Sequence, residues 1–132
     1  MDIDELLLAL AEYSTDPLGF VLFAYPWGEP GELERFSGPE PWQRELLIRI
    51  GLGVTTVVDA IAEAYARGED VEASPILEAT TSGHGIGKSA LVSWLIDWGM
   101  STVEDTKGVV TANTENQLKT KTWAELAKWH RL

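Results

Sequence analysis

Apolar positions recur at helical spacing through the first part of the chain. Asp4 can act as an N-cap for a first helix that runs to about Glu12. Asp16 followed by Pro17 predicts the start of a second helix, because an acidic cap and a proline in the first turn both favour helix initiation. The segment from Tyr25 to Pro41 is rich in Gly, Pro and Glu, which indicates a loop.

A longer helical pattern opens around residues 39–43 and ends at Gly68, a suitable C-cap residue. Gly51 and Gly53 predict an interruption within it, because glycine weakens a helix interior. Its apolar stripe consists of Trp42, Leu46, Leu47, Ile50, Val57, Val58, Ile61, Ala62 and Tyr65.

The second half of the chain predicts alternating strands and helices. The short apolar runs Ile76–Ala79 and Val109–Ala112 predict two buried strands. Helical patterns cover Lys88–Trp98 and Glu115–Leu132, the latter with Thr114 as its cap. The order strand, helix, strand, helix is typical of the start of a parallel α/β sheet.

Length and composition describe an ordinary globular chain. Its 132 residues suffice for one small core, which we divide into a mostly helical segment, 1–74, and the start of an α/β core, 75–132. The absence of cysteine excludes disulfides and cysteine metal sites. The net charge of −11 argues against a broad DNA-binding face. Basic residues gather near the C-terminus, where they form either a partner contact or a solvated helix face.

A glycine-rich loop carries the clearest chemical signal. It lies between the first predicted strand and the following helix. Its residues are Ser82, Gly83, His84, Gly85, Ile86, Gly87, Lys88 and Ser89. In a P-loop, glycines let backbone N–H groups surround phosphates, the lysine reaches the β- and γ-phosphates and the hydroxyl holds magnesium. The pattern predicts ATP and Mg²⁺ as ligands, with Ser89 on the metal. The alternative is a glycine-rich turn that happens to precede Lys88.

Gln43 is a second candidate ligand residue. Its side chain offers one donor and one acceptor in a plane, which matches the N6 and N7 edge of adenine. The alternative is a surface glutamine with no specific role. Phe36 and Trp42 lie nearby and either stack on a base or pack in the core.

Two further groups near the loop could respond to phosphate. His84 lies within the glycine-rich loop and either senses a γ-phosphate when protonated or faces solvent. Residues 111–117 follow the second predicted strand, at the sheet edge where ligands usually bind. Within them, Thr114 can equally serve only as a helix cap.

Three blocks in this order resemble the large subunit of tailed-phage and prophage terminases, the ATP-driven motors that package DNA. The blocks are residues 38–45, 82–89 and 111–119. The resemblance implies a P-loop NTPase fold of the RecA/ASCE type, with an N-terminal helical segment and a parallel sheet that is incomplete within these residues. It implies that Gln43 reads adenine and that residues 111–117 couple nucleotide to DNA movement. Many members have arginine where His84 stands here.

The resemblance also implies partners: double-stranded DNA, the portal and procapsid, the small terminase subunit and further copies of the chain. It places the protein in the cytoplasm of a host bacterium, away from membranes. The family's Walker B carboxylates and nuclease residues do not occur within the sequence, so we expect nucleotide binding with little turnover. The competing hypotheses are a non-catalytic prophage remnant or assembly module that oligomerises through tryptophan-rich faces, and another P-loop ATPase such as a helicase-like motor.

Overall fold

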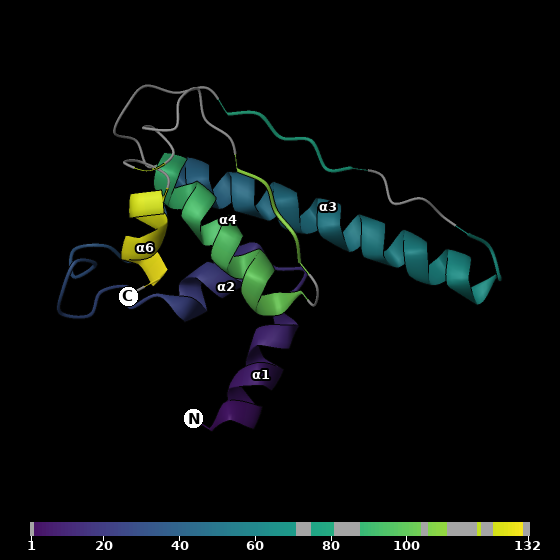
Figure 1. Ribbon diagram of the computed structural model, residues 1–132, viewed down its shortest axis with the longest axis horizontal. Coiled ribbons are helices and arrows are strands. Elements are labelled where there is room, and N and C mark those ends of the chain that lie inside the picture. Colours follow the sequence, from purple (N-terminus) through teal and green to yellow (C-terminus); the bar gives the residue numbers. More distant parts are fainter. Residues whose placement is uncertain are drawn as a thin grey trace.

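The computed structural model describes residues 2–70, 75–80, 88–103, 106–110, 119 and 123–130. Within these residues the secondary structure is entirely helical, and Figure 1 shows its arrangement. The helices are α1 (Ile3–Glu12), α2 (Pro17–Ala24), α3 (Pro41–Ala66), α4 (Lys88–Thr102) and α6 (Ala124–His130).

The two N-terminal helices begin at acidic caps. Asp2, not the expected Asp4, caps α1, and its Oδ1 accepts a hydrogen bond from the Glu5 N–H at 2.8 Å. The Asp16 Oδ1 accepts from the Gly19 N–H at 2.9 Å and Pro17 occupies the first turn of α2, as predicted.

Helix α3 runs without a break through Gly51 and Gly53, so the predicted interruption is wrong. A Cβ on Gly51 would lie 3.1 Å from the Thr15 carbonyl oxygen and 3.2 Å from the Pro17 ring. Gly51 therefore permits close approach of the chain that leads into α2. The predicted end of the helix is correct, because Gly68 follows the helix with a positive φ of 70°.

The core joins residues from both halves of the sequence. Helix α4 packs against α6 and α2, and α2 also packs against α3. Val21, Leu47 and Trp94 are among the most deeply buried side chains. Three tryptophans, Trp27, Trp94 and Trp129, lie with ring centroids 5.1–5.8 Å apart, so these rings build the core rather than an exposed face.

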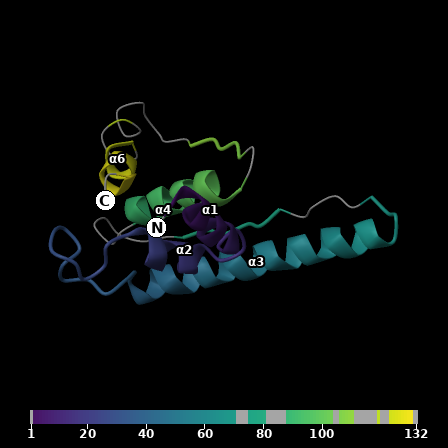
Figure 2. The same cartoon turned by 90° about the horizontal axis from the view of Figure 1, so that it is seen from below.

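The predicted parallel sheet is absent from the described residues, and the expected α/β fold is corrected to an all-helical one. Segments 75–80 and 106–110 contain no strand. Leu77 and Val109, which we expected to be buried, are 85% and 91% exposed. Figure 2 shows the two segments on different sides of α4. A strand needs a neighbour for its backbone N–H and C=O groups, and neither segment supplies one to the other.

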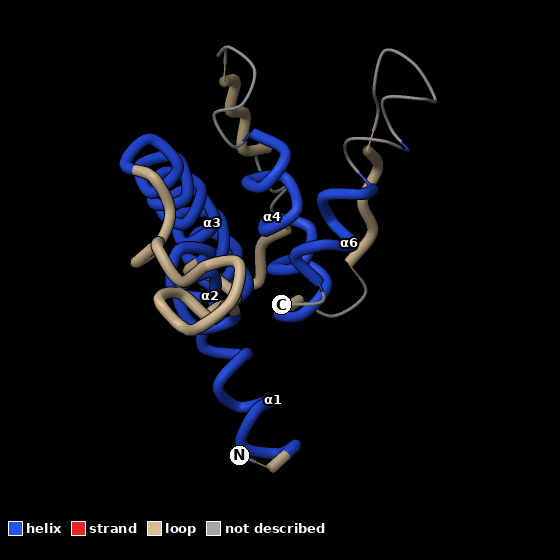
Figure 3. The backbone as a smooth tube through the Cα atoms, turned by 90° about the vertical axis from the view of Figure 1, so that its left-hand side faces the viewer, coloured by secondary structure: helices blue, strands red, loops and turns tan. Residues whose placement is uncertain are grey.

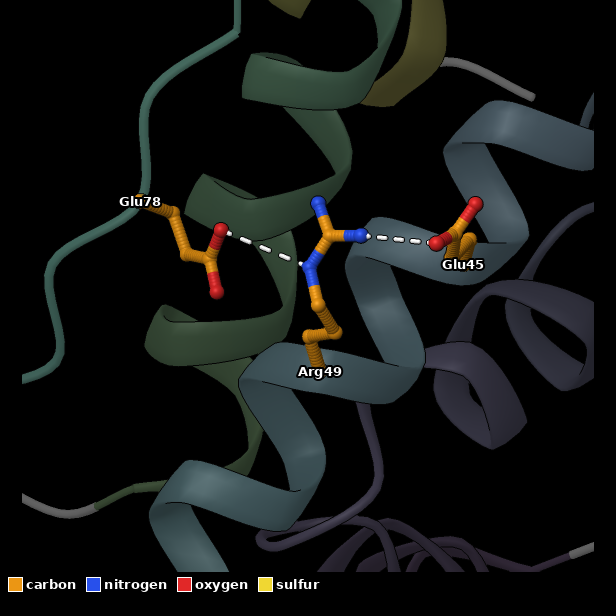
Figure 4. A network of polar contacts seen from close by, with 3 residues as sticks. All are labelled: Glu45, Arg49 and Glu78. Atoms are coloured by element: carbon orange, nitrogen blue, oxygen red, sulfur yellow. Dashed lines mark hydrogen bonds and ion pairs between the residues drawn. The ribbon is translucent and has the colours of Figure 1, made fainter.

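The segment 75–80 lies along α3 instead. Arg49 on α3 pairs with Glu45 one turn earlier at 3.0 Å and with Glu78 at 3.5 Å, as Figure 4 shows. All three side chains remain partly exposed, and such ion pairs contribute little stability each. A Cβ on Gly53 would lie 3.2 Å from the Ile76 side chain, so the same segment also touches the helix through apolar atoms.

Two helices extend beyond the shared core. The distal half of α3 projects from the other helices, as Figure 1 shows. Helix α1 contacts α4 and extends away from the other helices, as Figures 1 and 3 show. Both carry large apolar residues that are exposed. These are Ile3, Leu6, Leu7 and Leu8 on α1, and Leu52, Val58, Ile61 and Tyr65 on α3. In the part of the chain that the structure describes, no helix is long and apolar enough to cross a bilayer.

Candidate nucleotide-binding site

Helix α4 begins at Lys88, the lysine of the predicted phosphate-binding motif. Lys88 and Ser89 are exposed in the first turn, where the N–H groups of a helix have no partner within the helix. The preceding residues, Ser82 to Gly87 with His84 among them, lie outside the described residues. Residues 111–117 also lie outside them. The start of α4 is therefore the part of the motif that can be placed.

Gln43 lies in the first turn of α3 and is only 3% exposed. Its Oε1 accepts a hydrogen bond from the Glu40 backbone N–H at 2.8 Å, as in a capping box. The glutamine at the third helical position after Glu40 was the sequence signal for this role. The two roles expected for Gln43 were base recognition and an exposed position with no specific role, and its burial excludes the second.

A pocket of about 360 Å³ connects Gln43 with helix α4. Its wall comes from the loop before α3, the first turn of α3, the start of α4 and helix α6. The lining residues are Trp27, Glu32, Leu33, Phe36, Gly38, Pro39, Glu40, Gln43, Ala90, Trp94, Lys128 and Trp129. The structure thus brings Gln43 to the same pocket as Ala90, which follows Lys88 and Ser89 directly.

One side of the pocket is aromatic. Trp27, Trp94 and Trp129 all line it, with Phe36 from the same loop. The Trp94 ring stands edge-on to the other two tryptophans, with interplanar angles of 76° and 85°. The Trp94 Nε1 is buried without an acceptor among the described residues, while the Trp129 Nε1 donates to Glu125 at 2.8 Å. Nothing beyond the abundance of tryptophan in the sequence pointed to Trp27.

Three charged residues line the pocket, namely Glu32, Glu40 and Lys128. Lys128 on α6 pairs with Glu32 of the loop, Nζ to Oε2, at 3.9 Å. The Glu32 side chain is 59% exposed and that of Lys128 is 43% exposed. The Lys128 Nζ lies 5.6 Å from the centre of the Trp129 ring, which holds the ammonium over an aromatic face.

The loop before α3 forms much of this wall, and hydrogen bonds to backbone carbonyl oxygens hold it in place. The Arg44 Nε donates to the Pro39 carbonyl oxygen at 3.0 Å, and the Trp27 Nε1 donates to the Val21 carbonyl oxygen at 2.8 Å. The Gly28 N–H donates to the Leu33 carbonyl oxygen at 2.9 Å. The loop before α3 is therefore anchored at both ends to the helices that flank it.

Three polar side chains, those of Tyr25, Asp97 and His130, form a second cluster. The Tyr25 hydroxyl donates to the Asp97 Oδ2 at 2.7 Å, and the His130 Nδ1 lies 3.4 Å from the Asp97 Oδ1. Burial raises the pKa of Tyr25 far above its ordinary value, and the hydrogen bond to Asp97 and the charge of that carboxylate raise it further. This cluster links the end of α2 with α4 and α6.

Among the described residues, no three His, Cys, Asp or Glu side chains converge to hold a metal ion. Comparison with known family models, with curated proteins and with solved structures finds no match to this chain.

Proposed function

We propose that this chain binds an adenine nucleotide, with the base in the pocket beside Gln43 and the phosphates at the start of α4. The observation that carries the proposal is the pocket itself. It joins the buried Gln43 to the first turns of the helix that begins at Lys88. The pocket lining includes both Gln43 and Ala90, which directly follows Lys88 and Ser89, and this supports one site for two motifs that lie 45 residues apart in sequence.

The capping bond of Gln43 is compatible with base recognition. A carbonyl oxygen has two lone pairs, so Oε1 can accept from both the Glu40 N–H and the adenine N6 amine. The amide nitrogen donates, which suits the adenine N7. Guanine presents an acceptor, O6, in place of the N6 amine. The anchored Oε1 would repel it, so the site favours ATP over GTP.

The phosphate end relies on helix α4. Its 15 residues start at Lys88, and a helix N-terminus favours an anion through its N–H groups and dipole. Lys88 would neutralise the β- and γ-phosphates, and Ser89 would bind Mg²⁺ with them. The sequence motif also predicts His84 as a sensor of the γ-phosphate.

The wider role that we propose follows the resemblance to terminase large subunits. The nucleotide would serve a DNA-packaging motor in the cytoplasm of a host bacterium, with double-stranded DNA, the portal, the small subunit and further copies as partners. Hydrolysis transfers the γ-phosphoryl group to water and needs a positioned carboxylate, for which this sequence offers no Walker B pair. We therefore expect binding without rapid turnover.

The test is calorimetric titration of the purified chain with ATP and Mg²⁺, repeated with GTP. Lys88→Ala should weaken ATP binding by roughly tenfold or more, because it removes a direct charge contact to phosphate. Lys107→Ala is the matched control, since Lys107 is an exposed lysine outside the pocket. Absence of ATP binding, or equal loss in both variants, would refute the proposal.

A second candidate, an assembly module, is favoured by the exposed apolar residues of α1 and α3. Contiguous exposed apolar surface commonly marks a protein interface. Light scattering coupled to size exclusion would distinguish it. An oligomer that Val58→Lys disperses, combined with no nucleotide binding, would favour assembly over the nucleotide site.

A further inference from the structure

Two carboxylates line the pocket beside Gln43, those of Glu32 and Glu40. The Glu40 side chain accepts from the Gln43 backbone N–H in the capping box, so Glu32 is the carboxylate that a nucleotide site must still accommodate. Glu32 lines the pocket together with Gln43 and Lys128, and its Oε2 lies 3.9 Å from the Lys128 Nζ. A carboxylate accepts hydrogen bonds but repels phosphate oxygens. Within a nucleotide that occupies the pocket, the Glu32 carboxylate can therefore bind only a neutral part that has hydrogen-bond donors.

An adenine nucleotide offers few hydrogen-bond donors that Glu32 could bind. An adenine nucleotide has hydrogen-bond donors only at the N6 amine and the ribose hydroxyls. The N6 amine is assigned to the Oε1 of Gln43, whose position is held by the Glu40 N–H at 2.8 Å. The ribose hydroxyls remain, and a carboxylate on a ribose hydroxyl is a recurrent arrangement in nucleotide sites.

The lysine has a supporting part in this arrangement. Lys128 on α6 pairs with Glu32 of the loop, and its ammonium lies over the Trp129 ring. The pair joins α6 to the loop before α3. Lys128 thereby offsets the negative charge of Glu32 near a ligand that is itself an anion, and it restricts where the carboxylate lies.

We propose that Glu32, positioned by Lys128, binds the ribose hydroxyls and makes the pocket selective for ribonucleotides over deoxyribonucleotides. This inference rests on the proposed nucleotide function. If the pair is only a surface ion pair, it contributes little to stability and nothing to selectivity.

The experiment compares the affinities of the full chain for ATP, 2′-deoxyATP and 3′-deoxyATP, each with Mg²⁺, by calorimetry. We expect ATP to bind about tenfold more tightly than at least one deoxy analogue, because that analogue lacks a hydroxyl that would donate a hydrogen bond to a charged carboxylate. In Glu32→Gln that preference should fall to about twofold or less. Glu34→Gln removes the same charge two residues away, outside the pocket lining, and should keep the preference.

Lys128→Met tests the positioning role, with Lys107→Met as its control. The ratio of ATP to deoxy-nucleotide affinity should fall in Lys128→Met and stay unchanged in the control. A merely structural lysine would change the melting temperature and leave this ratio intact.

The outcomes separate the two proposals. Equal binding of ATP and both analogues by the unaltered chain, or a preference that survives Glu32→Gln, overturns the ribose assignment and leaves nucleotide binding in place. Failure to bind any of the three nucleotides overturns the proposed function and this inference with it.

Discussion

Replacing Gln43 with methionine tests both roles of this residue in one variant. Methionine keeps an unbranched side chain of similar length, and it removes the oxygen and the nitrogen of the amide. The Glu40 N–H then loses its acceptor at 2.8 Å, so the start of α3 loses a capping interaction. Loss of a cap of this kind costs about 1 kcal/mol in the free energy of unfolding.

The same change has a separate effect on nucleotide binding. If Gln43 pairs with the N6 and N7 edge of adenine, Gln43→Met removes two hydrogen bonds that together contribute about 1–3 kcal/mol. The dissociation constant for ATP should therefore rise about 5- to 150-fold. The affinity for GTP should not fall in parallel, because the guanine edge does not match the amide, so the ratio of ATP to GTP affinity should approach one.

Two assays and one control separate these effects. Urea unfolding followed by circular dichroism measures stability, and calorimetric titration with ATP and GTP measures binding. Asp16→Ala removes the cap of α2, whose Oδ1 accepts from the Gly19 N–H at 2.9 Å, and it lies outside the pocket lining. It should cost a similar 1 kcal/mol without changing the affinity ratio. An unchanged ATP to GTP ratio in Gln43→Met would show that the glutamine is a helix cap alone.

Two further predictions concern the helical core. The buried Tyr25 hydroxyl, whose pKa is raised by burial and by Asp97, stays protonated in the folded chain above pH 10, where the unfolded chain loses its proton. The free energy of unfolding should therefore fall by up to about 1.4 kcal/mol per pH unit above pH 10, and Tyr25→Phe should remove this part of the slope in urea titrations between pH 8 and 11. Gly51→Ala should destabilise the chain by about 1–2 kcal/mol, because the new Cβ meets the Thr15 carbonyl oxygen at 3.1 Å and the Pro17 ring at 3.2 Å. Gly53→Ala meets only the Ile76 side chain and should be neutral or stabilising by up to about 1 kcal/mol, so equal melting temperatures for the two variants would contradict this packing.

Local signals in the sequence were sufficient for several helix boundaries. Asp16 and Pro17 start α2, and Lys88 starts α4, as predicted. Gly68 follows the end of α3 with the positive φ that glycine adopts readily. These features depend on residues within one or two turns, which the linear sequence contains completely.

The predicted strands were wrong because a strand is not a local structure. The apolar runs around Ile76 and Val109 have a strand-like composition, but each needs a partner of matching direction to satisfy its backbone groups. The described segments lie on different sides of α4 and remain exposed. A short apolar run carries no information about whether such a partner will be beside it.

Local sequence patterns predicted the starts of α2 and α4 correctly, and they predict Gln43, Lys88 and Ser89 as nucleotide ligands. The fold buries Gln43 as a helix cap and brings it to the same pocket as the start of α4. It also decided that Gly51 permits helix contact rather than a break. The physical reason is the same in each case. Burial, close approach and shared pockets depend on residues far apart in the chain, such as Trp27, Trp94 and Trp129, whose proximity no local pattern encodes.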